Sequence, residues 1–335
     1  MANLRALMGM GSTPPGKRLI GTALWLPVVL LLVMAIIPVV TSSKATLSLL
    51  TQIIIMGIFA MSYDILLGYT GIVSFGHALF FGTGAYMAGL IIKHTDATLG
   101  YLLLAIVGTI IFAVLISVVI GYLSLRVKDV YFAMITLAFA ELFFIVAEKW
   151  RSVTNGADGF SFRVPPVLQD RIVYYYVMLA CLAVTVILLR GFINSPTGRV
   201  LLAIRENEKR AECLGYDVVK FKLISTMVAG VVASLAGIAW ALQQRFVSTG
   251  VMAADKTIDA LLMTTIGGTG TLYGALIGSG LTNMAKEGLA KLAKVYPILD
   301  RWYIIFGLFY IVIVLFFPGG IMGAFQGRRQ GKKVG

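Results

Sequence analysis

The side chains that could do chemistry are few in this chain and lie far apart. Its two histidines, His77 and His94, have no cysteine or carboxylate at the spacing of metal ligands. The sequence contains neither the G-x-x-x-x-G-K-[ST] motif of nucleotide hydrolysis nor the G-x-S-x-G motif of serine hydrolases. Two cysteines, Cys181 and Cys213, do not indicate a disulfide framework. We therefore expect no catalytic residues, no metal site and no cofactor bound by this chain.

Acidic residues inside the apolar segments are the next candidates, because a charge in lipid is costly unless it is paired or hydrated. Asp64, Glu141 and Asp259 are isolated in the sequence, whereas a membrane-embedded enzyme would need paired acidic residues or a His/Glu cluster. For Glu141 two roles stay open, a hydrogen bond to a neighbouring helix and a place on the wall of a translocation pathway. Asp64 lies near the end of a segment and is interpreted as a capping or snorkelling residue. His77 is interpreted as a packed polar residue rather than a proton relay.

The elements that must position these residues are membrane helices. The 335 residues are 59% hydrophobic and only 13% charged, and several apolar runs exceed the roughly 20 residues that cross a bilayer. The mean hydropathy is +0.92. The formal net charge of +13 comes mainly from short loops and tails, as expected beside anionic headgroups, and does not indicate nucleic-acid binding. We predict an all-α polytopic membrane protein.

About eight full spans are expected, one of them broken by glycines. They are residues 19–40, 46–67, 68–92 (the Gly-broken segment), 100–124, 130–148, 172–190, 219–242 and 302–317. Lys17 and Arg18 are interpreted as an anchor for the first span rather than part of a cleaved signal. In span 219–242 small residues recur at every fourth position, which predicts close helix packing.

Charge predicts the topology. With Lys17 and Arg18 inside, alternation also places the basic turn 126–128 and the loop 190–222 inside, as the positive-inside rule requires. Segment 258–281 is then expected to enter and return as two half-helices that meet near Gly267–Thr271, followed by a polar amphipathic piece at 286–301. Both termini and the basic tail 324–335 are expected in the cytoplasm.

The loop from Ser195 to Lys222 is the longest charged interval between spans. Ser195 or Thr197 is expected to cap a helix that starts with Pro196, and Gly215 and Asp217 are expected to end it and cap the next helix. One apolar stripe is predicted at Leu201, Ile204, Ala211 and Leu214. The spacing leaves two interpretations open, a docking element for a soluble partner and a helix lying on the lipid surface.

Six motifs in order resemble one family. They are GYTGIVSFGHALFFGTGAY (68–86), ITLAFAE (135–141), TNGADGF (154–160), GRVLLAIRENEKRAECLGYDVVKFK (198–222), IGGTGTLYGALIGSGL (266–281) and LFFPGGIMG (315–323). Together they resemble LivM-type permease subunits of ABC importers for branched-chain amino acids. The resemblance implies one permease domain over residues 1–335 in the bacterial inner membrane. It also implies three kinds of protein partner, namely a LivH-like second permease, two cytoplasmic ATPases that bind ATP-Mg, and an extracytoplasmic solute-binding protein.

The resemblance also implies roles for particular residues. Residues 195–216 match the coupling helix region, and the positions carried over for contact with the ATPases are Arg205, Glu206, Asn207, Glu208, Glu212 and Gly215. Candidates for the translocation pathway are Ser74, His77, Glu141, Thr269 and Gly270. A carboxylate at Glu141 departs from the amide expected in the family. Alternatives are an importer for urea, amides, sugars or aromatic acids, and a stand-alone ion-coupled carrier.

Overall fold

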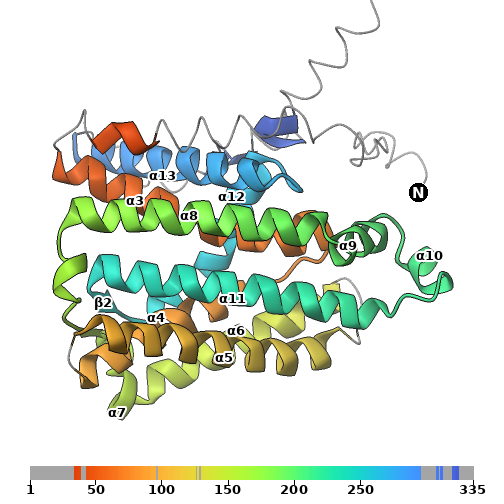
Figure 1. Ribbon diagram of the computed structural model, residues 1–335, viewed down its shortest axis with the longest axis horizontal. Coiled ribbons are helices and arrows are strands. Elements are labelled where there is room, and N and C mark those ends of the chain that lie inside the picture. Colours follow the sequence, from red (N-terminus) through yellow and green to blue (C-terminus); the bar gives the residue numbers. More distant parts are fainter. Residues whose placement is uncertain are drawn as a thin grey trace, which may run out of the picture.

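The computed structural model is almost entirely helical (Figure 1). It describes residues 34–38, 43–95, 97–125, 127, 130–295, 307–308, 310–311 and 319–323. In these ranges the only sheet is one antiparallel pair, β1 (Phe160–Ser161) with β2 (Phe246–Val247). The predicted all-α fold is confirmed. The predicted spans 19–40 and 302–317 lie largely outside the described residues, and the tail 324–335 lies wholly outside them.

Five helices of the described chain are long and apolar enough to cross a bilayer. They are α3 (Lys44–Asp64) continued by the π-helical turn η1 (Ile65–Thr70), α5 (Leu99–Ser124), α6 (Val130–Lys149), α8 (Arg171–Asn194) and α11 (Val218–Gln244). The shortest has 20 residues, which at 1.5 Å per residue matches the roughly 30 Å hydrocarbon core. Each agrees with a predicted span to within a few residues.

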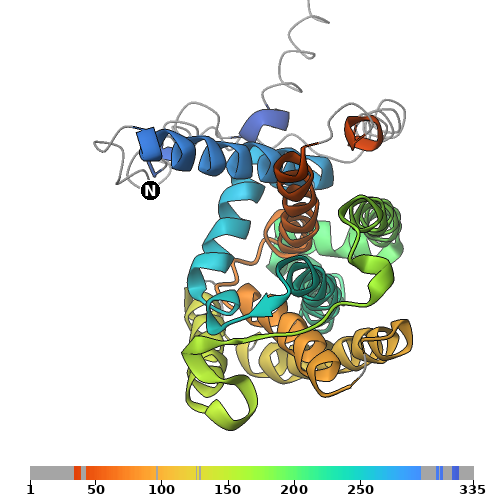
Figure 2. The same cartoon turned by 90° about the vertical axis from the view of Figure 1, so that its left-hand side faces the viewer.

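Helix α11 lies at the centre of the bundle and packs against α3, α4 (His77–His94) and α5 (Figure 2). Its small residues make this contact close, since Ala229, Ala233 and Ala241 are fully buried. A Cβ on Gly237 would collide with the backbone carbonyl of Phe81 on α4. The small-residue spacing therefore predicted a packing face correctly. By contrast, α5, α6 and α8 expose large apolar side chains, as helices in contact with lipid or another subunit do.

The Gly-broken segment 68–92 is not a complete span, contrary to the prediction. The helix that begins as α3 ends at Gly71, whose φ of 76° lies in the left-handed region that favours glycine. Residues 71–76 then run without helical structure, and α4 begins only at His77. Ala78 in the first turn of α4 donates its N–H to Thr257 at 2.8 Å, so α4 starts inside the bundle rather than at its surface. The density of glycines indicated a break but not its length.

Helices α12 (Ala254–Gly267) and α13 (Leu272–Val295) are bent by 113° at a four-residue break. The prediction of two helices that meet at the glycines of segment 258–281 is confirmed. As far as residue 295, the predicted polar amphipathic piece at 286–301 is the continuation of α13, which runs without interruption to Val295. Residues 296–301 lie outside the described chain.

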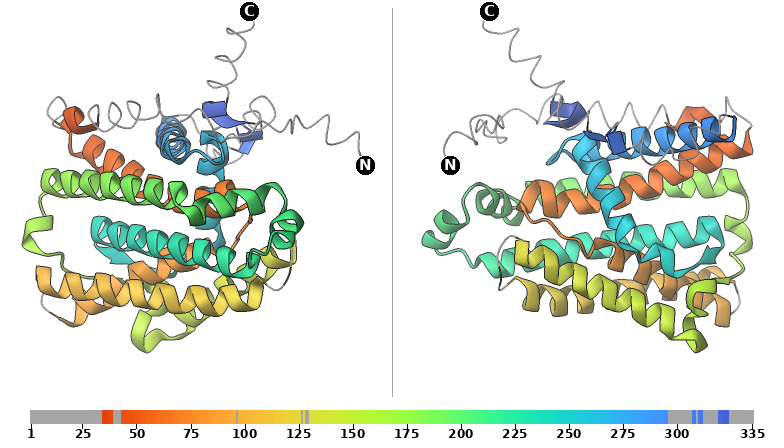
Figure 3. Two further views of the ribbon diagram at one scale, coloured as in Figure 1. Left: turned by 45° about the vertical axis from the view of Figure 1, so that its right-hand side comes forward. Right: turned by 180° about the vertical axis from the view of Figure 1, so that it is seen from behind.

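After the break the chain runs back along α3. Leu276 lies beside Gly57, and the Ser279 hydroxyl donates to the carbonyl of Ile53 at 2.9 Å. Because higher numbers on α13 meet lower numbers on α3, the two helices are antiparallel. The turn between α12 and α13 therefore lies at the level where α3 ends, as Figure 3 shows from behind.

The bundle has two distinct ends (Figures 1 and 3). The first, the α9 end, carries α9 (Pro196–Glu206) and α10 (Glu208–Cys213). The second, the β2 end, carries the sheet and the short helices α7 (Arg151–Thr154), η2 (Gly156–Asp158), η3 (Pro166–Leu168) and η4 (Thr249–Val251).

The turn after α5 also lies at the α9 end, because Leu125 packs in one cluster with Ile72, Phe132 and Leu223. The two basic connections, 126–128 and 190–222, therefore share one end of the bundle. This is the arrangement that their charges predicted. Arg126 and Lys128 themselves lie outside the described residues.

Candidate functional site

The charged loop between α8 and α11 folds as two short helices, which we call the α9–α10 unit (residues 196–213). The Ser195 hydroxyl caps α9 by accepting from the N–H of Gly198 at 3.2 Å, and Pro196 takes the first helical position. These two predictions are confirmed. Asn207 then leaves the helical conformation and caps α10 by accepting from the N–H of Arg210 at 3.0 Å. The sequence was read as one helix, and this internal cap divides it.

Two predicted boundary residues, Gly215 and Asp217, lie between the α9–α10 unit and α11. Gly215 has a φ of 87°, the left-handed conformation expected of a glycine that terminates a helix. Asp217 caps α11 by accepting from the N–H of Lys220 at 3.2 Å. The side chain of Lys220 also pairs with this carboxylate and lowers its pKa below the ordinary value of an aspartate. The entry into α11 is thus held by the cap that the sequence predicted.

One face of the α9–α10 unit packs onto the bundle. Leu201, Ile204 and Ala211 are buried in one cluster with Val218 at the start of α11. Leu214 is 69% exposed, so its predicted place in the apolar stripe is wrong. The predicted stripe requires a single continuous helix. The helix is interrupted at Asn207, so the side chains of α10 do not continue the face of α9.

The six residues predicted to couple to a partner divide into three pairs. Arg205 and Glu208 bind the membrane helices, Glu208 through an ion pair of 2.8 Å with Lys222 on α11. Asn207 and Gly215 shape the backbone, as described above. The side chains of Glu206 and Glu212 are exposed and make no hydrogen bond or ion pair with any other described residue. These two carboxylates are the acidic groups of the set that are not already engaged within the described chain.

Arg205 connects the α9–α10 unit to two broken segments at once. Its guanidinium donates a hydrogen bond to the carbonyl of Gly68 in η1. A Cβ on Gly270 would lie 3.0 Å from the same guanidinium, and one on Gly71 would lie 3.0 Å from the Arg205 Cγ. The side chain therefore lies against the end of α3 and against the turn between α12 and α13.

Asp64, on α3, binds the same turn between α12 and α13 that Arg205 contacts. Its side chain is fully buried, and Oδ1 accepts from the N–H of Gly270 at 2.7 Å. The prediction of a capping or snorkelling residue is therefore wrong, because Asp64 binds a backbone group of a distant segment. A Cβ on Gly68 would collide with this carboxylate and with the backbone of Gly270. Only a glycine at position 68 permits the two segments to approach this closely.

We call these four residues, Asp64, Gly68, Arg205 and Gly270, the hinge cluster. The turn that holds Gly270 is itself tightly folded. Gly268 and Gly270 have φ values of 115° and 78°, and the Thr271 hydroxyl donates to the carbonyl of Gly268 at 2.6 Å. Thr269 at the tip of the turn is exposed. Of the predicted pathway residues, Thr269 and Gly270 thus belong to this turn.

Ser74 lies in the break before α4 and His77 is the first residue of α4, and both are buried. The Ser74 hydroxyl accepts from the N–H of Gly76 at 3.3 Å. The His77 ring lies 2.8 Å from the hydroxyl of Ser62 and stacks on Phe59, with centroids 5.2 Å apart. This environment fits the interpretation of His77 as a packed polar residue.

Glu141 lies apart from the other predicted pathway residues. Its side chain is exposed on α6, and it makes no hydrogen bond or ion pair with another described residue. The predicted bond to a neighbouring helix is absent within the described chain. A pathway role would require a second subunit on this face.

The hinge cluster shows what the sequence could reveal and what it could not. Asp64 and Gly68 are four residues apart on one helical face, which is the one signal of this cluster that the sequence contains. Their contacts to Gly270 and Arg205 span 206 and 137 residues and follow no local pattern. The cluster thus connects α9 with the end of α3 and with the turn between α12 and α13.

Comparison with known proteins agrees with this architecture. Residues 45–316 match the family model described as branched-chain amino acid transport system / permease component. The chain is 24% identical to the LivM high-affinity branched-chain amino acid transport system permease protein of Escherichia coli K12 over 287 residues. The match covers 77% of this chain and 67% of that protein.

Two further relatives widen the comparison. A probable LivM of Methanocaldococcus jannaschii is 24% identical over 311 residues, covering 79% of this chain and 89% of the relative. The autoinducer 2 import system permease LsrC of Yersinia pseudotuberculosis YPIII is 26% identical over 276 residues, covering 74% and 77%. In the Salmonella typhimurium LivM the chain spans 66% of the relative's length. No solved structure matches the chain.

The family match covers the hinge cluster, the α9–α10 unit and all five long apolar helices. A multi-pass helical bundle with broken segments at its centre is the architecture of a transport subunit. The chain belongs to the family of permease components of branched-chain amino acid transport systems.

Proposed function

We propose that this chain is one permease subunit of an ATP-driven importer, and that ATPase subunits drive it through the α9–α10 unit. The observation that carries the proposal is Arg205. It lies on the helix that carries the exposed Glu206, and its guanidinium binds the end of α3 beside the α12–α13 turn. A partner that moves α9 would therefore move the hinge cluster, as rigid-body switching requires.

The rest of the assembly follows from the family. The partners are a LivH-like second permease, two ATPases that bind ATP-Mg, and an extracytoplasmic solute-binding protein. The α9 end faces the cytoplasm, because the basic connections gather there. Both chain termini and the tail 324–335 lie on the same side, and the whole chain forms one permease domain in the inner membrane. The subunit itself has no enzymatic activity.

The proposed ATPase contact consists of the two exposed acidic side chains of the α9–α10 unit. Glu206 and Glu212 have no partner among the described residues, whereas Glu208 is occupied by Lys222. A basic or amide-rich groove on the ATPase is the complementary surface. On a lipid surface the anionic headgroups would bind the exposed Arg199, Lys209 and Arg210 of the same unit instead, which is the alternative that the docking test addresses.

The proposed pathway follows the two breaks, residues 71–76 and 268–271. Non-helical backbone at membrane depth is tolerated where protein buries it or where it lines a water-filled cavity. Ser74, Thr269 and Gly270 belong to these breaks, and His77 directly follows the first. Glu141 would reach the pathway from α6 at the contact with the second permease.

Branched-chain or other hydrophobic amino acids are the proposed cargo, since the family and the LivM relatives carry that description. The LsrC relatives, which are named for autoinducer 2 import, keep other small solutes as the second candidate class. An ion-coupled carrier is disfavoured because the apolar segments carry few charges, while the chain has a long charged loop between α8 and α11 that a stand-alone carrier does not need.

The test is leucine uptake into proteoliposomes that contain this chain, its permease partner, the ATPases and the binding protein. We expect uptake only with ATP. The double variant Glu206→Lys with Glu212→Lys should lose most of the co-purified ATPase, because it reverses both exposed charges. The matched control is Glu287→Lys, an exposed helical glutamate distant from the α9–α10 unit.

Uptake that persists without ATP or without ATPase subunits would refute the importer. Retention of the ATPases by the double variant, at the level of the Glu287→Lys control, would refute this docking surface.

A further inference from the structure

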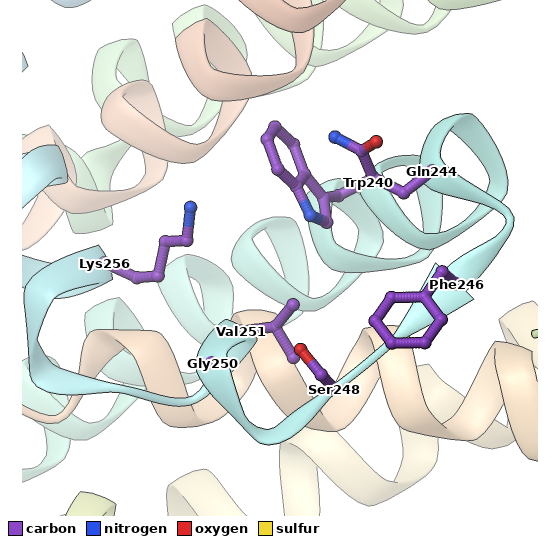
Figure 4. Close-up of a pocket in the computed structure, with 7 residues that line it drawn as sticks. All are labelled: Trp240, Gln244, Phe246, Ser248, Gly250, Val251 and Lys256. Atoms are coloured by element: carbon purple, nitrogen blue, oxygen red, sulfur yellow. The ribbon is translucent and has the colours of Figure 1, made fainter. Parts of the chain in front are cut away.

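A cavity of about 350 Å³ lies at the β2 end, opposite the α9–α10 unit (Figure 4). It is lined by Trp240, Gln244, Phe246, Ser248, Gly250, Val251 and Lys256. α11 begins beside the α9–α10 unit and brings Trp240 and Gln244 to the cavity with its last turns. The volume falls at the lower end of the range of small-molecule sites, which is about 300–1,000 Å³. The cavity thus lies where cargo would enter if the α9 end faces the cytoplasm.

Lys256 supplies a basic side chain to this cavity. Its Nζ lies 4.7 Å from the centroid of the Trp240 ring, a cation–π contact. Asp255 and Asp259 of α12 both attract this ammonium electrostatically, and Asp259 also pairs with Lys286 at 2.5 Å. Asp255 is exposed and does not line the cavity. Lys256 itself has no ion pair with any described carboxylate.

The position of Lys256 makes this charge costly without an anion. It lies in the first turn of α12, at the positive end of the helix dipole. No side chain caps this helix end, and Asp255 is the acidic residue of the turn. A carboxylate placed beside the ammonium would be attracted by both. The Trp240 ring, which is 9% exposed, would hold the Lys256 side chain in place beneath it.

The remaining lining separates into polar and apolar parts, as Figure 4 shows. The Gln244 amide and the Ser248 hydroxyl make no hydrogen bond with another described residue, so both are free to bind a ligand ammonium. Phe246 lies across the cavity from Lys256, with Val251 between them in the view. An α-amino acid carries these same three parts, a carboxylate, an ammonium and an apolar side chain.

We propose that this cavity binds the free amino acid after its release from the solute-binding protein. In this site Lys256 binds the α-carboxylate, and Trp240, Phe246 and Val251 surround the side chain. The inference rests on the proposed function, because it takes the cargo to be a hydrophobic amino acid. It adds an entry site that requires a carboxylate on the cargo.

The test uses the purified complex of both permeases and the ATPases in nanodiscs, without the binding protein. Binding of L-leucine is compared with binding of L-leucinamide, which lacks the carboxylate charge, by isothermal titration. We expect the wild-type complex to bind leucine at least about tenfold more tightly than leucinamide, as for the loss of a charged hydrogen bond. Lys256→Met should remove this preference, and Lys256→Arg should keep most of it.

Lys291→Met is the matched control, because it removes an exposed lysine of α13 that pairs only with Glu287 along its own helix. It should bind leucine as the wild type does. Equal binding of leucine and leucinamide by the wild type, or an unchanged preference in Lys256→Met, would overturn the proposal. So would a result in which the wild type does not bind free leucine and Lys256→Met weakens only the contact with the binding protein.

The two proposals fail in different ways. If the ATPases co-purify and ATP drives uptake while free leucine does not bind, the entry site is wrong and the importer stands. If no ATPase assembles with the permeases, the importer itself is wrong.

Discussion

At the scale of single residues, the proposed coupling depends on Arg205 and Asp64. Both side chains bind backbone atoms of segments that are distant in the sequence. A charged group that binds a backbone group gives a stronger and more directional contact than two neutral groups do. Both contacts would therefore keep α9, the end of α3 and the α12–α13 turn together if these segments move as a rigid body.

Arg205→Met should uncouple ATP hydrolysis from uptake. A hydrogen bond from a charged donor contributes about 1.5–3 kcal/mol, so we expect uptake to fall by about tenfold or more. The ATPases should still co-purify, because Arg205 faces the membrane helices. Arg199→Met, which removes an exposed arginine of the same helix, is the control. Loss of ATPase binding in Arg205→Met, with the coupling of the remaining complex intact, would contradict this role.

Gly68→Ala should destabilise the hinge cluster. The added methyl group would collide with the Asp64 carboxylate and with the backbone of Gly270, an overpacking that costs about 1–3 kcal/mol. Thermal unfolding of the purified complex measures the loss. Gly191→Ala is the control, since a Cβ there meets nothing within 4 Å. Equal midpoints for the two variants would show that the close approach at Gly68 does not matter.

At the scale of elements, the length of the apolar runs made the long helices predictable. Only a run of this length can cross the hydrocarbon core as a helix that pairs its own backbone groups. The division at Asn207 and the full extent of the break at 71–76 were not predicted. Both depend on the local backbone conformation, which a hydropathy pattern does not contain. The direction of α13 along α3 comes from contacts such as that of Ser279 with Ile53, which no single stretch of sequence contains.

Asn207→Ala should loosen α10 without releasing α9. Loss of an N-cap costs about 1 kcal/mol, which corresponds to about fivefold faster amide exchange in a helix of this kind. Hydrogen exchange measured by mass spectrometry over residues 208–213 tests this. Asn207→Asp keeps an acceptor at the cap and should exchange like the wild type. Unchanged exchange in Asn207→Ala would mean that packing alone holds α10.

At the scale of the whole molecule, the bundle places its two proposed contacts at opposite ends. The α9–α10 unit lies at one end and the cavity of Lys256 and Trp240 at the other (Figure 1). α11 reaches both ends, and its small-residue face holds it tightly against α4. Such close packing lets one helix transmit displacement along its length. The exposed apolar faces of α5, α6 and α8 remain for lipid and for the second permease.

Glu141→Gln tests whether α6 meets the second permease or the pathway. A carboxylate that faces only lipid would be costly, so we expect it to interact within the assembly. An exposed charge interaction contributes up to about 1 kcal/mol, which predicts a two- to about fivefold change in uptake rate or in selectivity among amino acids. Uptake of leucine, valine and phenylalanine is compared in proteoliposomes. If Glu141→Gln transports each of the three amino acids at the wild-type rate, Glu141 has no role in transport.

The central claim is that an ATPase acts on this permease through the α9–α10 unit. The most direct measurement places a photo-crosslinking amino acid at Glu212 in the assembled complex. Val127, in the other connection at the same end, and Trp150, near the opposite end, serve as comparison positions. We predict a strong crosslink from position 212 to the ATPase subunit and none from position 150. A crosslink from position 127 alone, with position 212 bound only to lipid, would contradict the account.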